Sequence, residues 1–294
     1  MTEATSGSTV PRRQLGRYLR DARGKARMTV RIAAAELEWS EAKLWRIETG
    51  QTALRSLDVE AMCRVYGAPD ELTDALKALA KETKEKGWWF AYSNVIPPWF
   101  HVYIGLEEAA TELQSYQSEI VPGLCQTPDY ARTMIATDNP DVDSVEIERR
   151  VQLRMARQPL LTRGTAPLRL TVLLNEAVLR RPVGGRRLMA AQLARLRELS
   201  TLPNVALHVV PFVAGLHHGV QSGPFIILRF PVNGDGRESE PPTVYVDGFT
   251  GALYLDKPHE IARYDAAFAR ILRVAADEDR SRALLGAAMK EMGG

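Results

Sequence analysis

The stretch from Thr29 to Gly50 constrains the fold most, because it holds the start and stop signals of two short helices. Thr29 and Ser40 each precede a helical pattern and carry a hydroxyl that can accept a hydrogen bond from the first turn. These N-caps predict helices over about Val30–Leu37 and Ser40–Thr49, the second of which ends at Gly50. Only a two-residue turn separates them. Two short helices joined so tightly predict a helix-turn-helix, whose second helix can enter the major groove of DNA.

The sequence on either side of this motif predicts three more helices. Leu15, Leu19 and Ala22 recur at helical spacing and form the apolar stripe of a helix that precedes the motif. Two further helices are predicted at about 54–66 and 70–84. The expected first domain is therefore all-α, with five helices.

Length and composition place this domain in a larger chain. The 294 residues suggest two domains, and 45% apolar with 25% charged residues is normal for a soluble globular protein. Residues 1–11 are polar and predict a disordered lead-in, which leaves residues 12–85 for the helix-turn-helix domain. Because no run approaches the roughly 18 apolar residues of a membrane span, we expect a cytoplasmic protein, associated with the nucleoid when bound to DNA.

The second helix of the motif has an inner and an outer face. Leu44 and Ile47 fall on the face expected to pack inward, so the residues around them point outward, where they can reach base edges and phosphates. Arg31 and Arg55, at the starts of the flanking helices, are candidate phosphate contacts. The predicted DNA-binding residues are Arg31, Ser40, Glu41, Ala42, Lys43, Trp45, Arg46 and Arg55.

Each of these side chains also has a structural alternative. Arg46 can pair with Glu41 or Glu48 on the helix surface, and Trp45 can contact protein rather than the sugar-phosphate backbone. Charge alone does not decide between DNA contact and a structural role for these side chains. The chain has a net charge of only +2, yet the region 12–31 carries eight basic residues against the single acid Asp21, a pattern typical of polyanion binding. The eight are Arg12, Arg13, Arg17, Arg20, Arg23, Lys25, Arg27 and Arg31.

The segment MTVRIAAAELEWSEAKLWRIETG resembles the helix-turn-helix of the lambda-repressor/Cro-like (XRE) family, chiefly in Arg46–Gly50 and the preceding Ala34 and Leu37. The family usually has glutamine where this chain has Val30, and glycine in the turn where it has Glu38. It often has glutamine where this chain has Glu41. A carboxylate accepts from cytosine and repels phosphate, so these departures imply an operator different from that of relatives.

Beyond an aromatic and proline-rich junction at 86–100, which we expect to pack rather than act as a flexible linker, the pattern changes. Helices alternate with apolar strand-like runs, which predicts an α/β or α+β domain over 101–294 with a mixed sheet of four or five strands. Residues 231–242 are predicted to form an exposed loop between two strands. Helices are predicted at 106–118, 128–136, 145–158, 185–200 and 259–276, and strands at 168–174, 205–211, 225–230, 243–246 and near Leu253.

This second region carries distinctive motifs at 87–89, 121–124, 126–127, 129–130, Arg163, 175–185, 223–225 and 244–246. In their combination the region is similar to the large C-terminal domain of a group of actinobacterial, antitoxin-like regulators, in which an XRE-type helix-turn-helix precedes a domain of formerly unknown function. The resemblance implies a small partner protein and roles in development, antibiotic production or a toxin–antitoxin-like pair.

The sequence gives little support for catalysis or for cofactor binding. The sequence has no HExxH, Walker, GxGxxG or GxSxG motif, so we expect neither an enzyme nor a cofactor. Asn175 and Glu176, at the end of a strand, are the best candidate polar site for a partner or ligand, although capping of a helix is the stronger reading. His217 and His218 are weaker candidates, because adjacent residues on a strand face opposite sides and cannot easily share a metal. The two cysteines form no CxxC pair.

Together these features predict a homodimeric transcriptional regulator of the repressor type that binds double-stranded DNA at an inverted-repeat operator. Its C-terminal domain would mediate dimerisation and bind a small partner protein or small-molecule effector that modulates DNA binding. The alternative is an antitoxin-like interaction module that sequesters a small partner protein, with DNA binding secondary. A weaker third possibility is an enzyme regulated through DNA binding, which would require turnover by the C-terminal domain.

Overall fold

The computed structural model describes residues 9–83, 88–92, 94–96, 98–232, 238–249 and 251–293. They form two compact units, each with its own core. Unit 1 takes the chain up to Ala91 together with His101–Ala109, and unit 2 takes Tyr92–Phe100 together with the chain from Ala110 onward. Most of the predicted lead-in, part of the predicted junction and the middle of the predicted 231–242 loop lie outside the described residues.

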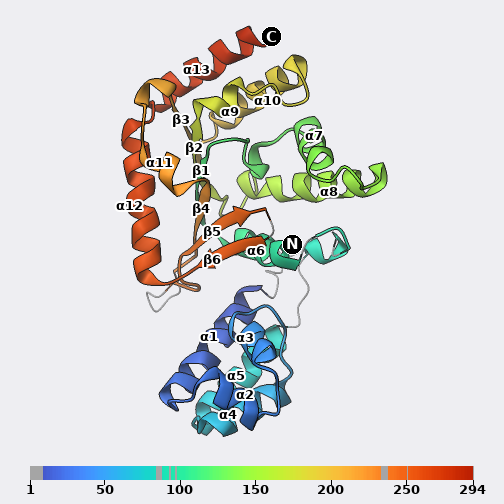
Figure 1. Cartoon of the computed structure of the whole chain (residues 1–294), viewed down its shortest axis with the longest axis vertical. Coiled ribbons are helices and arrows are strands. Elements are labelled where there is room, and N and C mark those ends of the chain that lie inside the picture. Colours follow the sequence, from blue (N-terminus) through green and yellow to red (C-terminus); the bar gives the residue numbers. More distant parts are fainter. Residues whose placement is uncertain are drawn as a thin grey trace. The chain divides into compact units, whose positions relative to one another are not determined.

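Unit 1 confirms the prediction of five N-terminal helices (Figure 1). Their apolar faces meet in one core that includes Leu15, Leu19, Leu44, Ile47 and Met62. The first helix begins at Thr9, inside the segment expected to be a disordered lead-in. The helices are α1 (Thr9–Lys25), α2 (Val30–Glu36), α3 (Glu41–Glu48), α4 (Ser56–Tyr66) and α5 (Asp70–Glu82).

The junction contributes to both units. It forms a short 3-10 helix, η1 (Trp88–Tyr92), and opens α6 (Pro98–Ala109). Of the junction side chains that the structure describes, Trp89, Val95 and Ile96 are buried. Within unit 1, Trp88 Nε1 donates to Glu108 Oε2 at 3.0 Å.

Unit 2 is an α/β domain built on a six-stranded mixed sheet, in the order β3-β2-β1-β4-β5-β6. The first three strands are parallel and the last three run antiparallel to their neighbours. Figure 1 shows α11 and α12 on one side of this sheet and α7, α8 and α10 on the other. The strands are β1 (Glu112–Gln117), β2 (Arg169–Asn175), β3 (Val205–Val210), β4 (Phe225–Arg229), β5 (Thr243–Gly248) and β6 (Gly251–Leu255).

The helices of unit 2 connect these strands and close the chain. Ile261, Phe268 and Ile271 of α12 pack on Tyr116 and Phe225 of the sheet, which forms the core on that side. The long helices are α7 (Pro128–Asp138), α8 (Ser144–Arg157), α10 (Arg186–Leu199), α12 (Pro258–Val274) and α13 (Glu278–Glu291). The short ones are η2 (Gly123–Cys125), η3 (Gln158–Leu161), α9 (Glu176–Arg180), η4 (Phe212–Ala214) and α11 (His218–Ser222).

The prediction of a helix over 106–118 is wrong. Helix α6 ends at Ala109, and Glu112–Gln117 is β1, which pairs with β2 on one edge and with β4 on the other. This pairing on both edges outweighs the local sequence pattern, in which the polar Ser115 follows Gln114 and yet is buried between Val172 of β2 and Ile226 of β4. With β1 added, the sheet has six strands rather than four or five. Among the described residues, no helix combines the length and apolar character needed to cross a membrane.

Candidate DNA-binding surface

The two helices of the motif begin at the predicted caps. The Ile32 backbone N–H donates to Thr29 Oγ1 at 3.2 Å, and the Lys43 N–H donates to Ser40 Oγ at 3.2 Å. Each hydroxyl thereby satisfies one of the N–H groups that the first turn of a helix leaves without a partner. The caps fix where α2 and α3 start, and so determine which side chains of α3 face outward.

The turn between α2 and α3 uses a strained conformation. Glu38 has φ of 55°, in the left-handed region, at the position where the lambda-repressor/Cro-like family usually carries glycine. The turn closes because the Trp39 N–H donates to the Ala34 carbonyl at 2.8 Å. The departure from glycine therefore changes the local strain and leaves the geometry of the turn intact.

Helix α3 is fixed to α1 by an ion pair that the sequence analysis did not anticipate. Arg23 Nε lies 2.6 Å from Glu48 Oε1, and Arg23 Nη2 lies 2.7 Å from Glu48 Oε2. The remaining nitrogen, Nη1, donates to the Met28 carbonyl at 2.8 Å. Both side chains are largely buried, so this bidentate pair ties the last turn of α3 to α1 and to the start of α2.

Two glycines let the helices approach closely. A Cβ on Gly16 of α1 would lie 2.5 Å from the Ile47 carbonyl oxygen, so only glycine allows α1 to cross α3 at this distance. Gly50 has φ of 72°, and its Cβ would lie 2.7 Å from the Arg13 backbone. The carboxyl end of α3 is therefore held by packing as well as by charge.

The outer face of α3 is accessible, as predicted. Leu44 and Ile47 are buried, whereas Glu41, Ala42 and Arg46 are exposed. The large Trp45 ring is 55% exposed on the same face. Exposed aromatic and cationic side chains on a fixed helix suit contact with bases and phosphates.

The two cations of α3 differ in how they are held. Lys43 Nζ lies 3.4 Å above the centroid of the Trp39 ring, a cation–π contact that directs the ammonium toward the turn. Arg46 forms no ion pair or hydrogen bond through its guanidinium with any residue that the structure describes. Its alternative partner Glu48 is occupied by Arg23, so the guanidinium of Arg46 stays available for a ligand.

The flanking arginines are also exposed. Arg31 lies at the start of α2, and Arg55 precedes α4. Arg55 Nε is 3.0 Å from Asp58 Oδ2, and this hydrogen bond holds the pKa of the Asp58 carboxyl below its ordinary value. A phosphate would therefore compete with Asp58 for Arg55.

The basic block at 12–31 is only partly a charged surface. Arg13 is buried, Arg12 donates to the Thr83 carbonyl at 2.9 Å, and Arg23 is paired with Glu48. These arginines hold the helices of unit 1 together. The block members that are exposed are Arg20, Lys25, Arg27 and Arg31.

In unit 2 the four predicted partner-site residues have clear structural contacts. Asn175 caps α9 by accepting from the Ala177 N–H at 2.9 Å. Glu176 accepts from the Phe212 N–H at 2.9 Å and pairs with Arg180 at 3.0 Å. Capping and bracing therefore account for both residues, in line with the stronger reading of the sequence.

The two histidines lie at the start of α11 rather than on a strand. His217 Nδ1 accepts from the Gly219 N–H at 3.1 Å, and its ring meets Tyr116 edge-on at 6.0 Å. Burial, followed by the charge of His218, lowers the pKa of His217. His218 Nε2 lies 2.8 Å from Arg270 of α12. In the described part of the chain, no three His, Cys, Asp or Glu side chains gather closely enough to hold a metal ion.

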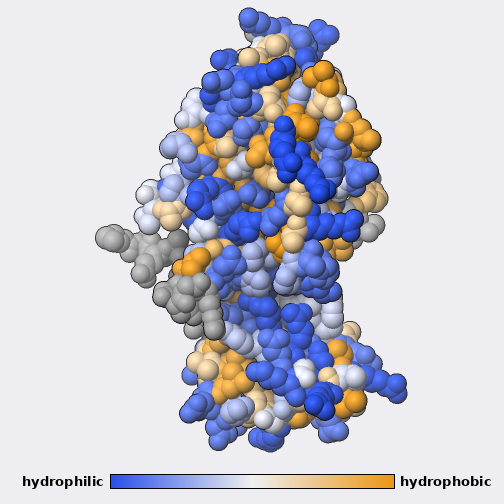
Figure 2. Space-filling view, turned by 90° about the vertical axis from the view of Figure 1, so that its left-hand side faces the viewer, coloured by the Kyte–Doolittle hydropathy of each residue, from blue (hydrophilic) through white to orange (hydrophobic). Residues whose placement is uncertain are grey.

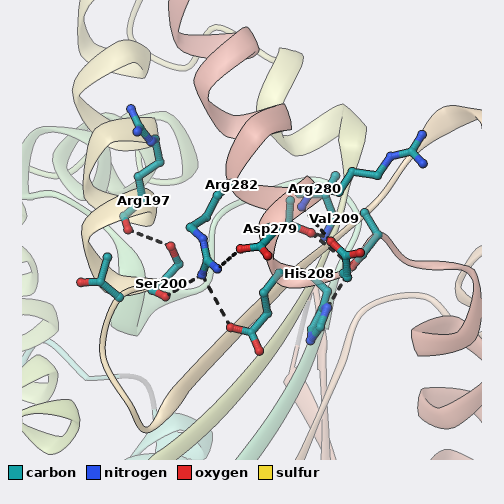
Figure 3. A network of polar contacts seen from close by, with 12 residues as sticks. Arg197, Ser200, His208, Val209, Asp279, Arg280 and Arg282 are labelled. Atoms are coloured by element: carbon teal, nitrogen blue, oxygen red, sulfur yellow. Dashed lines mark hydrogen bonds and ion pairs between the residues drawn. The ribbon is translucent and has the colours of Figure 1, made fainter.

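A depression of about 580 Å³ lies at the amino-terminal ends of β2 and β3. It is bordered by 169–171, 200–206 and Arg282. Figure 3 shows Arg282 between Ser200, whose carbonyl it contacts at 3.2 Å, and Asp279. Arg169, the other arginine of this depression, pairs with Glu112 at 2.9 Å. Both guanidinium groups are thus occupied by partners within the chain, and the network holds α13 against the end of α10.

A capped helix, a tight turn and a second helix fixed at both ends with its polar face outward define the helix-turn-helix class. Residues 14–76 match the family model of a helix-turn-helix domain, which indicates DNA binding. Residues 100–287, more than half of the chain, match the model described as "Domain of unknown function (DUF5753)". The chain therefore belongs to the DUF5753 family. No curated protein and no solved structure matches it.

Proposed function

We propose that the chain is a sequence-specific transcriptional regulator of the repressor type that binds DNA through α3. The observation that carries this proposal is the Arg46 guanidinium, which has no partner among the described residues, beside the exposed Trp45 on a helix fixed by the Arg23–Glu48 pair. The likeness of the motif to the lambda-repressor/Cro-like family supports it. Arg31 and Arg55 would contact phosphates on either side and set the position of α3 in the groove.

The proposed active form is a homodimer on an inverted repeat. One α3 helix per half-site requires half-sites about one helical turn, or roughly 34 Å, apart. Unit 2 would mediate dimerisation and bind a small partner protein or a small molecule. Such a ligand alters DNA affinity only if it binds one arrangement of the two DNA-binding heads better than another. This mechanism needs no catalytic step, and we propose none.

The second candidate is an antitoxin-like module that sequesters a small partner protein, with DNA binding secondary. The observation that favours it is the group of large apolar side chains left exposed between Phe212 and Val220 of unit 2. In this case, stable co-purification with the product of a neighbouring gene would be the main activity. Loss of the α3 contacts would then leave most of the biological effect in place.

The test is a band-shift titration of the full chain against DNA from its own promoter and against random duplex of equal length. The proposal expects a marked preference for the promoter, and weaker binding when Lys43 and Arg46 are both changed to alanine. Equal affinity for the two duplexes would refute sequence-specific binding. Unchanged affinity of the double variant would refute the assignment of α3.

A further inference from the structure

The segment from Phe212 to Val220 presents apolar side chains to solvent. Phe212, Val213, Leu216 and Val220 are all exposed, and we call these four side chains the 212–220 surface. Val213 is 84% and Leu216 is 80% exposed, which is unusual for residues of this kind placed so close together. Clustered exposed apolar side chains in a folded domain mark a surface that another molecule covers.

The backbone that carries this surface is well anchored. Glu176 accepts from the Phe212 N–H, His217 caps α11, and His218 contacts Arg270 of α12. Ala214, between the exposed residues, packs on the core of the sheet. The apolar side chains therefore point outward from an ordered segment, and the predicted partner-site residues Glu176, His217 and His218 act as its supports.

The neighbouring helix α12 adds positive charge. Arg270 touches α11 through His218, and Arg263 and Arg273 are exposed on the same helix. Among the described residues, none of the three has a carboxylate within ion-pair distance. Figure 2, which looks at the molecule from the side of α12, shows strongly hydrophilic side chains lying among hydrophobic ones.

The acidic side chains nearby already have partners within the chain. Glu176 pairs with Arg180, and Asp265 of α12 pairs with Arg229 of β4. At the start of α13, Asp277 caps the helix and Glu278 and Asp279 pair with Arg282. The charge left beside the 212–220 surface is therefore positive.

This charge argues against a second copy of the chain as the occupant. In a two-fold contact the same patch lies on both sides of the interface, so the α12 arginines of both copies would place positive charge there. A membrane surface fits less well, because interfacial helices present a long apolar stripe whereas α11 has five residues. A polypeptide with an apolar face and acidic flanks would satisfy both the apolar side chains and the arginines.

We propose that the 212–220 surface, together with Arg270 and Arg273, is a docking site for an acidic amphipathic helix of a partner protein. The inference rests on the proposed function, in which unit 2 binds a partner, and it specifies where and with what chemistry. Apolar anchors provide the affinity and the arginines select the sign of charge on the partner.

The test uses the full chain and two labelled peptides, each about 18 residues long so that a helix can form. Both carry leucines at helical spacing, flanked by glutamates in one and by lysines in the other. The glutamate peptide should bind at least about tenfold more tightly. Changing Val213 and Leu216 to serine should weaken it by at least about tenfold, because two apolar anchors are lost. The matched control is Phe249→Ser, which removes an aromatic ring that is 98% exposed on the β5–β6 turn.

A charge-reversal variant, Arg270→Glu with Arg273→Glu, leaves the apolar side chains in place. It should bind the lysine peptide better than the glutamate peptide. Equal binding of the two peptides by the native chain, or no reversal in this variant, would overturn the proposal. It would also be overturned if V213S/L216S abolished self-association, or abolished binding to vesicles of anionic phospholipid, while leaving peptide binding unchanged.

Measuring DNA binding by the same proteins distinguishes failure of the docking site from failure of the proposed function. Specific DNA binding without peptide binding would refute only the docking site. Absence of specific DNA binding in the native chain would refute the proposed regulator, whatever the peptides do.

Discussion

The guanidinium of Arg23 on α1 forms a bidentate ion pair with the carboxylate of Glu48 on α3, through two contacts of 2.6 and 2.7 Å. This pair lies at the carboxyl end of the helix whose outer face carries Arg46. It fixes the position of α3, and it also engages Glu48, a buried carboxylate that could otherwise have paired with Arg46. The same contact thus provides structural support and leaves Arg46, the cation proposed to contact DNA, without an ion-pair partner among the described residues.

Removing one partner of this pair should loosen α3. Arg23→Ala leaves the largely buried Glu48 carboxylate without its cation, which costs about 3 kcal/mol or more. Hydrogen–deuterium exchange of α1 and α3 peptides in the full chain should therefore speed up by about a hundredfold. The control is Arg20→Ala, an exposed site on the same helix, expected to change stability by less than about 0.5 kcal/mol. Equal exchange in the two variants would show that the pair does not hold α3.

The turn should respond to glycine in opposite ways at two nearby positions. Glu38→Gly relieves a left-handed conformation and should stabilise unit 1 by about 1 kcal/mol. Glu36→Gly, also exposed but in the last turn of α2, should destabilise it by up to about 1 kcal/mol. The urea midpoints of the two variants should lie on either side of that of the native chain. Midpoints shifted in the same direction would contradict the account of the turn.

Arg46 is expected to act on DNA affinity and leave stability unchanged. Arg46→Ala should weaken binding to promoter DNA by about 1–3 kcal/mol, because a contact to a base or phosphate is lost. The melting temperature should stay nearly the same, since the exposed Arg46 side chain forms no hydrogen bond or ion pair with the described residues. Arg64→Ala, which removes an exposed arginine from α4, is the matched control and should bind DNA normally. A similar loss in both variants would indicate only a general effect of charge.

Acidification should weaken unit 2 through His217. Its Nδ1 accepts from Gly219 and must be unprotonated to cap α11, and burial lowers its pKa. As pH falls below the ordinary histidine value of about 6.5, the unfolded chain takes up a proton before the folded chain does, and stability falls. His217→Asn keeps an acceptor at the cap without this titration. The drop in melting temperature between pH 7.5 and 5.5 should therefore be smaller in H217N than in the native chain. An equal drop would contradict this role.

The helix-turn-helix could be predicted because its signals are local. Thr29 and Ser40 cap helices within three residues of themselves, and the apolar spacing of Leu44 and Ile47 gives the inner face directly. The Arg23–Glu48 pair could not be predicted, because it joins residues on different helices whose distance depends on the close crossing at Gly16. Without that contact, Arg23 looked like part of a basic surface and Glu48 like a partner of Arg46.

In unit 2, local patterns gave most strands but missed the central one. β1 owes its conformation to β2 and β4, which are far away in the sequence, and its buried Ser115 hides the apolar alternation. The 212–220 surface could not be predicted from the sequence for a similar reason. Its apolar residues look like core residues in the sequence, and only the packing of Ala214 and His217 beneath them shows that Val213 and Leu216 are left outside.

The most direct test of the central claim is selection of binding sites from a random duplex library with the full chain, followed by sequencing. Binding through α3 predicts enrichment of an inverted repeat, with half-site centres about 10–10.5 base pairs apart or a multiple of that spacing. The same selection with Arg46→Ala should lose the motif or relax it at the contacted position. No enriched motif with the native chain, or an identical motif with R46A, would contradict the assignment of α3 as the helix that reads DNA.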